Sequence, residues 1–224
     1  MEATTLSSMV FLNRGGRYVG RELPREAQMS PGFGVSVGDM DGDGKEDLFI
    51  SQNFFATQAE GWRSDAGRGL WLRGDGQGNF AAVPGQESGV RVYGEQRGCA
   101  LSDYDGDGRI DLVVSQNGAE TKLFHNVGAR PGLRVRLKGG AGNGAGVGAA
   151  MRLVFGGGRS GPLREVHGGS GYWSQDGAVQ VMATPEEPKQ VWVRWPGGKT
   201  VTADLPPRAR EIVINREGAV KVLR

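Results

Sequence analysis

Short apolar runs alternate with polar, glycine-rich turns along most of the chain. Typical runs are Val35-Ser-Val37, Leu48-Phe-Ile50 and Leu133-Arg-Val-Arg-Leu137. Runs of this length, bounded by Gly and Asp, are typical of β-strands. No run approaches the roughly 18 apolar residues of a transmembrane helix, so we expect no membrane span. The pattern predicts an all-β protein.

One block of sequence occurs twice, 64 residues apart. Residues 34–53 read GVSVGDMDGDGKEDLFISQN, and residues 98–117 read GCALSDYDGDGRIDLVVSQN. In both copies an acidic loop lies between two strand-like runs. A fixed period indicates a repeated supersecondary unit, so we predict a strand, an acidic loop and a second strand in each copy.

A second element separates the two copies. Residues 11–18 and 70–80 each read as a strand, a glycine turn and a second strand that begins with an aromatic residue. Residues 123–128 resemble the beginning of a third hairpin of this kind. Glycine supplies the positive φ angles of tight hairpin turns. The resulting order of hairpins predicts four-stranded units.

Each acidic loop carries carboxylates at relative positions 1, 3, 5 and 9. They are Asp39, Asp41, Asp43 and Asp47 in the first loop, and Asp103, Asp105, Asp107 and Asp111 in the second. Charges this close repel unless a cation or solvent compensates them, and the interleaved glycines let the backbone curl so that the carboxylates converge. Six to eight oxygen ligands suit Ca²⁺. We therefore predict two Ca²⁺ sites, with the carbonyl groups of Lys45 and Arg109 as further ligands.

These loops differ from EF-hands and from zinc sites. An EF-hand needs a bidentate Glu at position 12 and flanking helices, whereas position 12 here is Ile50 or Val114, inside a predicted strand. Zinc is disfavoured because neither loop contains His or Cys. The alternative hypothesis is a pair of solvated acidic turns. Two loops that match in register favour the metal sites over this alternative.

Composition and charge indicate a boundary. Glycine contributes 40 of 224 residues, which indicates many tight turns. The net charge is +2, but residues 1–128 hold 12 basic and 18 acidic side chains, against 15 and 7 in residues 129–224. This asymmetry predicts two domains, 1–128 and 129–224. The basic charges are dispersed, so we expect no nucleic-acid partner. The single cysteine, Cys99, forms no internal disulfide and is expected to be buried.

Residues 11–128 resemble FG-GAP repeats, also called VCBS repeats. The resemblance rests on the two Asp-x-Asp-Gly-Asp-Gly-x-x-Asp loops and on the Phe33-Gly34-Val35 segment. It implies calcium-binding blades of an integrin-type β-propeller. It also implies an extracellular or periplasmic location, where millimolar calcium fills sites of modest affinity.

The remainder resembles the ASPIC/UnbV domain, which follows such repeats in bacterial proteins and in cartilage acidic protein 1. The matching residues are Asn143, Gly148-Ala149, Arg164-Glu165-Val166, Gly168 to Gln175 and Trp195 to Gly198. Two segments depart from the family: Ala150 stands where Arg is usual, and Val179 to Ala183 replaces a His-Phe-Gly-Leu-Gly stretch. The predicted fold is thus about two propeller-type blades, an incomplete propeller, followed by a β-sandwich-like domain.

The predicted blades are too few to close a ring. Closed propellers typically have four to eight blades, and a 64-residue period allows about two before residue 128. Because the sequence starts without a signal peptide, we expect it to be the C-terminal piece of a longer protein. The alternatives are a homo-oligomer that completes the ring and a second domain that covers the open edge.

The leading functional hypothesis is a non-enzymatic, calcium-stabilised module that binds a protein or a glycan. One alternative is an accessory or enzymatic factor for a small molecule, with His167 and Trp173 in a pocket at the domain junction. Another is a scaffold that self-assembles through open blade edges. Residues 54–69, with Phe54, Phe55 and Trp62, form either a binding loop or a flap on the neighbouring blade.

Three further patterns are not expected to carry catalysis or to bind a cofactor. Gly144 to Ala149 matches a dinucleotide-binding pattern but lacks the helix that holds a pyrophosphate. The polar cluster of His167, Ser170, Ser174 and Asp176 has no nucleophile-elbow motif, and we expect no catalysis from His125 either. Trp192 and Trp195 are expected to lie on one face of a strand, in the core.

Overall fold

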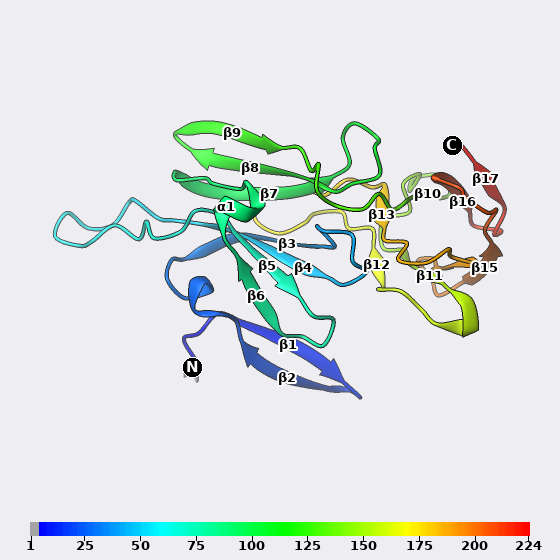
Figure 1. The fold of residues 1–224 in the computed structure, drawn as a ribbon, viewed down its shortest axis with the longest axis horizontal. Helices are drawn as coiled ribbons and strands as arrows, with labels where there is room; N and C mark the ends of the chain where they lie inside the picture. Colours follow the sequence, from blue (N-terminus) through cyan, green and yellow to red (C-terminus); the bar gives the residue numbers. More distant parts are fainter. Residues whose placement is uncertain (1–4) are drawn as a thin grey trace.

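The computed structural model describes residues 5–224. Within this range the chain forms seventeen short strands, one α-helical turn, α1 (Gly85–Ser88), and two 3-10 turns, η1 (Arg25–Ala27) and η2 (Gly156–Gly158). The predicted all-β class is therefore confirmed. Figure 1 shows the sheets formed by the first half of the chain on one side and the C-terminal sheets on the other. Among residues 5–224, no helix is long and apolar enough to cross a membrane.

The first element is a hairpin of strands β1 (Met9–Arg14) and β2 (Arg17–Glu22). The two residues that connect them, Gly15 and Gly16, have φ angles of 62° and 84°. Two consecutive positive φ angles define the turn that best fits the twist of a hairpin. The hairpin predicted from residues 11–18 is present.

The duplicated blocks form two antiparallel sheets. The first has the order β3 (Gly32–Gly38), β4 (Asp47–Gln52), β5 (Leu70–Gly74) and β6 (Phe80–Val83). The second has the order β7 (Glu95–Ser102), β8 (Asp111–Asn117) and β9 (Ala119–Phe124). Their registers repeat with the sequence, since Val37 pairs with Leu48 and Leu101 pairs with Leu112. Within the described residues the second sheet has three strands, so the expected four-stranded unit occurs once.

The two repeat sheets pack together through β3 and β7. The two strands approach closely at Gly34, where a Cβ atom would lie 2.9 Å from both the carbonyl oxygen of Arg97 and the Sγ of Cys99. Phe49 and Val114 are fully buried in the shared core. Cys99 is buried there as predicted, and burial raises the pKa of its thiol to about 11.

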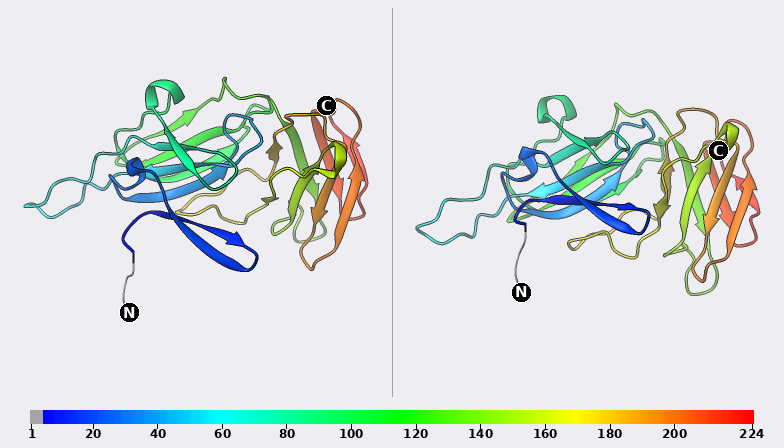
Figure 2. Two further views of the ribbon diagram at one scale, coloured as in Figure 1. Left: turned by 60° about the horizontal axis from the view of Figure 1, so that its bottom comes forward. Right: turned by 90° about the horizontal axis from the view of Figure 1, so that it is seen from below.

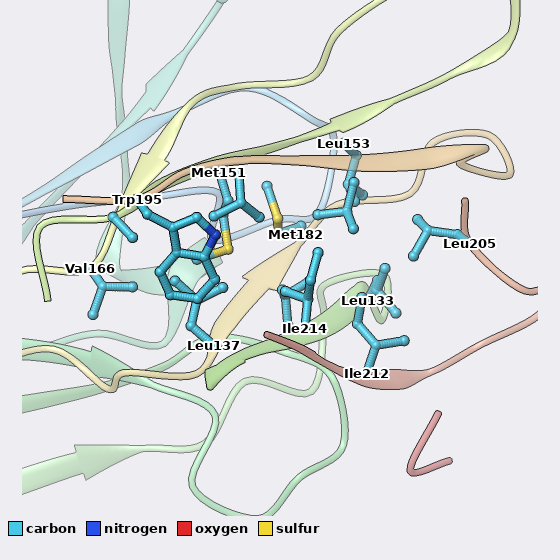
Figure 3. Packing of buried hydrophobic residues seen from close by; sticks show 14 of the residues in the cluster. Leu133, Leu137, Met151, Leu153, Val166, Met182, Trp195, Leu205, Ile212 and Ile214 are labelled. Carbon is cyan, nitrogen blue, oxygen red and sulfur yellow. The ribbon is translucent and has the colours of Figure 1, made fainter. Parts of the chain in front are cut away.

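Residues 133–222 form two further sheets, stacked as a sandwich. One has the order β13 (Gln180–Met182), β10 (Leu133–Lys138), β16 (Glu211–Asn215) and β17 (Val220–Val222). The other has the order β12 (Arg164–Glu165), β11 (Ala150–Val154), β14 (Gln190–Arg194) and β15 (Thr200–Asp204). Only β10 and β16 pair in parallel among these strands. The inner faces of the two sheets meet in the apolar core shown in Figure 3, which includes Met151, Leu153 and Ile212.

The two tryptophans near β14 lie on opposite faces, contrary to the expectation from the sequence. Trp195 is 2 % exposed and lies in the sandwich core. Trp192 points to the other face, where the guanidinium carbon of Arg152 lies 4.8 Å from the centre of its ring. Side chains alternate along a strand with a period of two, so residues three positions apart face opposite ways.

The acidic loops and the sandwich lie at the same end of the repeat sheets. The connection from β9 to β10 contacts both loops: the Arg130 amide donates to the Asp41 carbonyl at 3.3 Å, and the Gly132 amide donates to the Gly108 carbonyl at 2.8 Å. The long connection between β4 and β5 projects from the opposite end, as Figures 1 and 2 show in three orientations.

Candidate metal centre

The first acidic loop connects β3 to β4 and is folded around the carboxylate of Asp39. This side chain accepts hydrogen bonds from the amides of Gly42 at 2.7 Å, Asp43 at 3.1 Å and Gly44 at 2.7 Å. Gly42 and Gly44 have φ angles of 75° and 91°, a conformation that glycine adopts without strain. The sequence thus specifies a loop that curls around its own first residue.

The second acidic loop, between β7 and β8, has the same hydrogen bonds. Asp103 accepts from the amides of Gly106 at 2.8 Å, Asp107 at 3.1 Å and Gly108 at 2.8 Å. Each distance agrees with its counterpart in the first loop within 0.1 Å. The duplication in sequence is therefore a duplication of backbone conformation, including positive φ angles at both glycines.

The aspartate at position 9 anchors each loop to the sheet. Asp47 accepts from the amide of Met40 at 3.0 Å and from that of Gly74, on β5, at 2.8 Å. Asp111 accepts in the same way from the amide of Tyr104 at 3.1 Å and from that of Asn126 at 2.8 Å. Burial raises the pKa of Asp47 to about 6 and also raises the pKa of Asp111. Both carboxylates therefore lie where negative charge is poorly solvated.

Seven of the eight predicted carboxylates take part in three clusters of closely spaced ligand atoms, and Asp47 takes part in none of these. The clusters are Asp39, Asp41 and Asp43; Asp103, Asp105 and Asp111; and Asp105, Asp107 and His125. Within each cluster the ligand atoms lie within 4.8 Å of one another. The two clusters made of carboxylates alone fit a hard divalent cation such as Ca²⁺. The third adds the imidazole of His125, a nitrogen ligand that suits zinc better than Ca²⁺ and that the sequence of the loop itself does not contain.

Lys45 and Arg109, predicted as carbonyl ligands, also place their side chains on the loops. The Nζ of Lys45 lies 2.8 Å from Asp43 Oδ2, and Nη1 of Arg109 lies 2.5 Å from Asp107 Oδ2. Their amides donate to the Oδ1 atoms of the same aspartates, at 2.8 Å in both loops. The residue at position 7 thus contacts the carboxylate at position 5 through both backbone and side chain.

A basic side chain, which no pattern in the sequence indicates, also lies against position 3 of each loop. Nε of Arg73 lies 2.9 Å from Asp41 Oδ2, and Nε2 of His125 lies 3.0 Å from Asp105 Oδ2. Arg73 follows Leu72, which pairs with Leu48 of β4. His125 follows Phe124, which pairs with the equivalent residue of β8, Leu112. The two side chains therefore occupy equivalent positions in the repeat.

The second loop differs from the first in a buried contact with the sandwich. Arg134, on β10, contacts the carboxylate of Asp103, and its Nε lies 3.1 Å from Glu211 Oε2, on β16. The side chains of these three residues are 8 %, 0 % and 4 % exposed, respectively. In the first loop the nearest counterpart is Arg164, whose Nε lies 3.0 Å from Glu46 Oε1. These partners come from distant parts of the chain, and no spacing in the sequence indicates them.

Most of the sandwich matches a known protein family. Residues 139–221 match the family described as ASPIC and UnbV. The match starts after β10, although β10 pairs with both β13 and β16. A search of the curated proteins finds no match. The C-terminal part of the resemblance in sequence is therefore confirmed at the level of the domain.

In the ASPIC/UnbV domain Ser170 and Asp176, two members of the polar cluster, stabilise a loop. The Ser170 hydroxyl accepts from the amide of Asp176 at 2.8 Å, and Asp176 in turn accepts from the amide of Leu101, on β7, at 2.7 Å. His167 is exposed, with its Nε2 3.9 Å from Glu165. The Gly144 to Ala149 segment of the same domain lies in the connection between β10 and β11, as expected of a loop between strands.

The long connection between β4 and β5 is attached at its base and exposed at its tip. Phe54 forms a bridge with Ser64, and the amide of Phe55 donates to Glu95 at 2.8 Å. Trp62 is 95 % exposed. The loop therefore extends outward and leaves its tryptophan accessible, which is compatible with a binding loop.

Proposed function

We propose that the protein is a non-enzymatic, calcium-binding β-repeat module of the FG-GAP/VCBS type that presents an interaction surface outside the cell or in the periplasm. The observation that supports this most is the pair of acidic loops with the same backbone hydrogen bonds. Because the two loops position four carboxylates each in the same way, we infer that each binds the same kind of ligand and that they are not two unrelated turns.

The fit to Ca²⁺ rests on the donor set. Asp39, Asp41, Asp43 and Asp47 would hold one ion, and Asp103, Asp105, Asp107 and Asp111 the other, with the carbonyls of Lys45 and Arg109 as additional oxygen ligands. A bound Ca²⁺ supplies positive charge to a loop whose carboxylates otherwise depend on the chain's own cations. The exposed side chains of Lys45, Arg73 and His125 can swing into solvent when an ion takes that place.

The experiment is thermal unfolding in millimolar Ca²⁺ and in chelator. A site with a dissociation constant one hundredth of the free calcium concentration adds about 2.7 kcal/mol to the free energy of unfolding. We expect a higher midpoint in Ca²⁺, and a loss of that increase in the double variant Asp41→Asn/Asp105→Asn. Asp65→Asn, in the exposed loop between β4 and β5, is the matched control. Equal midpoints of the wild type with and without Ca²⁺ would exclude the metal.

A pocket between the repeat sheets supports a second candidate, a small-molecule factor. The pocket has a volume of about 320 Å³ and is lined by Phe49, Trp71, Val90, Leu112 and Phe124, among others. This is within the range of small-molecule sites. The domain-junction site expected around His167 and Trp173 has less support, because both side chains are largely exposed. Filling the pocket with Val90→Trp should abolish binding of any ligand found by a thermal-shift screen.

The exposed edges of the sheets support the scaffold hypothesis and the possibility of a homo-oligomer or a longer propeller. Every residue of β2 is exposed, and β9 is exposed along nearly its whole length. Unpaired edges can add a further strand. Size-exclusion chromatography with light scattering tests this, because a monomer at all concentrations would exclude self-assembly.

A further inference from the structure

The glycine-rich segment of the ASPIC/UnbV domain, residues 168–175, carries an unusually exposed tryptophan. Trp173 is 92 % exposed and has a φ of 47°, in the left-handed region that residues other than glycine rarely adopt. In Figure 1 this segment, in yellow, runs from the sandwich back over the repeat sheets. Backbone strain of this kind persists where the surrounding structure imposes it, and it concentrates at functional positions.

Trp173 belongs to an aromatic platform that three separate chain segments build. Its ring stacks on Tyr172, with an interplanar angle of 14° and a centroid distance of 5.9 Å. Tyr172 meets Phe33, on β3, edge to face at 5.7 Å, and Phe33 lies 6.2 Å from Phe54, which follows β4. We call these four rings, Phe33, Phe54, Tyr172 and Trp173, the aromatic platform.

Hydrogen bonds hold the glycine-rich segment, residues 168–175, in place. The amide of Ser170 donates to the carbonyl of Ser174 at 2.8 Å, and the Ser174 hydroxyl donates to the Ser170 carbonyl at 3.1 Å. The amide of Gly177 then donates to the Leu101 carbonyl, on β7, at 2.9 Å. Gly98 allows the close approach, since a Cβ there would lie 3.0 Å from the Tyr172 carbonyl oxygen. The exposed ring is therefore preorganised, which lowers the entropic cost of binding.

The charge around the platform indicates a neutral ligand. Arg97 lies over the rings of Phe33 and Phe54, at 4.1 and 5.7 Å. Its guanidinium group already pairs with Glu95 at 2.8 Å and donates to the carbonyls of Asn53 and Gln96 at 3.1 and 2.8 Å. A cation that is neutralised in this way offers little to an anionic ligand.

We propose that the aromatic platform binds a neutral glycan, with a pyranose ring stacked on Trp173. A flat ring that protrudes, rather than one that lines a groove, matches the C–H face of a sugar better than it matches a peptide, which needs a groove or a sheet edge. The exposed neighbour Gln175 can exchange hydrogen bonds with sugar hydroxyls. This inference rests on the interaction role proposed above, but not on the calcium sites.

The test is binding of the neutral oligosaccharides cellohexaose, xylohexaose and mannohexaose, measured by calorimetry and by tryptophan fluorescence in Ca²⁺ and in chelator. We expect at least one to bind, and Trp173→Ala to weaken binding at least about tenfold, as for a central aromatic anchor. Trp173→Gly should also lose binding while it keeps the thermal midpoint, because glycine accepts the positive φ. Tyr18→Ala, which removes an exposed ring on β2 that belongs to neither the platform nor the loop between β4 and β5, should bind like the wild type.

Other outcomes overturn the proposal. Absence of binding to all three oligosaccharides refutes it, as does binding that Trp173→Ala leaves unchanged. Binding only to a heparin hexasaccharide or only to a proline-rich decapeptide, run in parallel, would assign the platform to another class of ligand. The calcium hypothesis fails separately, by equal unfolding midpoints with and without Ca²⁺, so the two failures are distinguishable.

Discussion

Replacing Arg134 by Met should destabilise the protein, because the change leaves two carboxylates buried without their shared cation. Arg134 contacts Asp103 in the second acidic loop and Glu211 on β16, and both of these side chains are at most 4 % exposed. Met keeps an unbranched apolar stem of similar reach, so the main loss is the charge and its hydrogen bonds.

The size of the effect follows from what each carboxylate retains. Removing one partner of a buried ion pair costs about 3–5 kcal/mol. Glu211 keeps its contact with Arg136, and Asp103 keeps three backbone amide donors. We therefore expect the lower end, about 3 kcal/mol, which lowers the unfolding midpoint of a chain of this length by roughly 6–12 °C.

The assay is thermal unfolding followed by circular dichroism in chelator, with Arg136→Met as the control. Arg136 contacts the same glutamate but its side chain is 44 % exposed, so its loss should cost about 1 kcal/mol or less. In Ca²⁺ the penalty of Arg134→Met should shrink, because an ion in the second loop would neutralise Asp103. A change within about 0.5 kcal/mol of the wild type, or equal losses in both variants, would refute the reasoning.

Two further predictions concern the repeat sheets. Gly34→Ala should lower the free energy of unfolding by about 1–3 kcal/mol through overpacking, since its Cβ would lie 2.9 Å from the Sγ of Cys99. Urea unfolding measures this change. Gly128→Ala, where a Cβ meets nothing within 4 Å, is the control and should leave the free energy of unfolding unchanged. Glu95 has its pKa lowered to about 2, first by the amide of Phe55 and then by two side-chain partners. Its contribution to stability is therefore complete above pH 4.5 and lost as the pH falls towards 2. Midpoints measured across that range should fall less steeply in Glu95→Gln, and parallel curves would contradict the assignment.

The features that the sequence predicts correctly are local ones. Strand lengths, hairpin turns at consecutive glycines and the curled loops around Asp39 and Asp103 depend on residues close together in the chain. The face of Trp192 was predicted wrongly although it too is local, because two tryptophans three positions apart suggest one cluster while the period of a strand is two. Pattern reasoning fails here when residue type is weighed above spacing.

The counter-cations of the acidic loops could not be predicted in the same way. Arg73 and His125 occupy equivalent places, yet they are 52 residues apart whereas the aspartates that they contact are 64 apart. The long connection between β4 and β5 has no counterpart of equal length between β8 and β9, so the repeat shifts out of phase. Their different chemistry, Arg in one sheet and His in the other, hides the equivalence further. Strand register is what reveals it.

The connection from β9 to β10, here called the linker, gives both acidic loops a second reason to contain glycine, besides the positive φ angles of their own turns. A Cβ on Gly42 would lie 2.6 Å from the carbonyl oxygen of Arg130, and one on Gly108 would lie 3.0 Å from that of Gly132. The linker therefore packs against the backbone of both loops at positions where a side chain would exclude it. Arg134 lies just after this linker, on β10, and contacts Asp103. The acidic loops are therefore the surface on which the sandwich packs. A cation that orders these loops would consequently also order the attachment of the C-terminal domain.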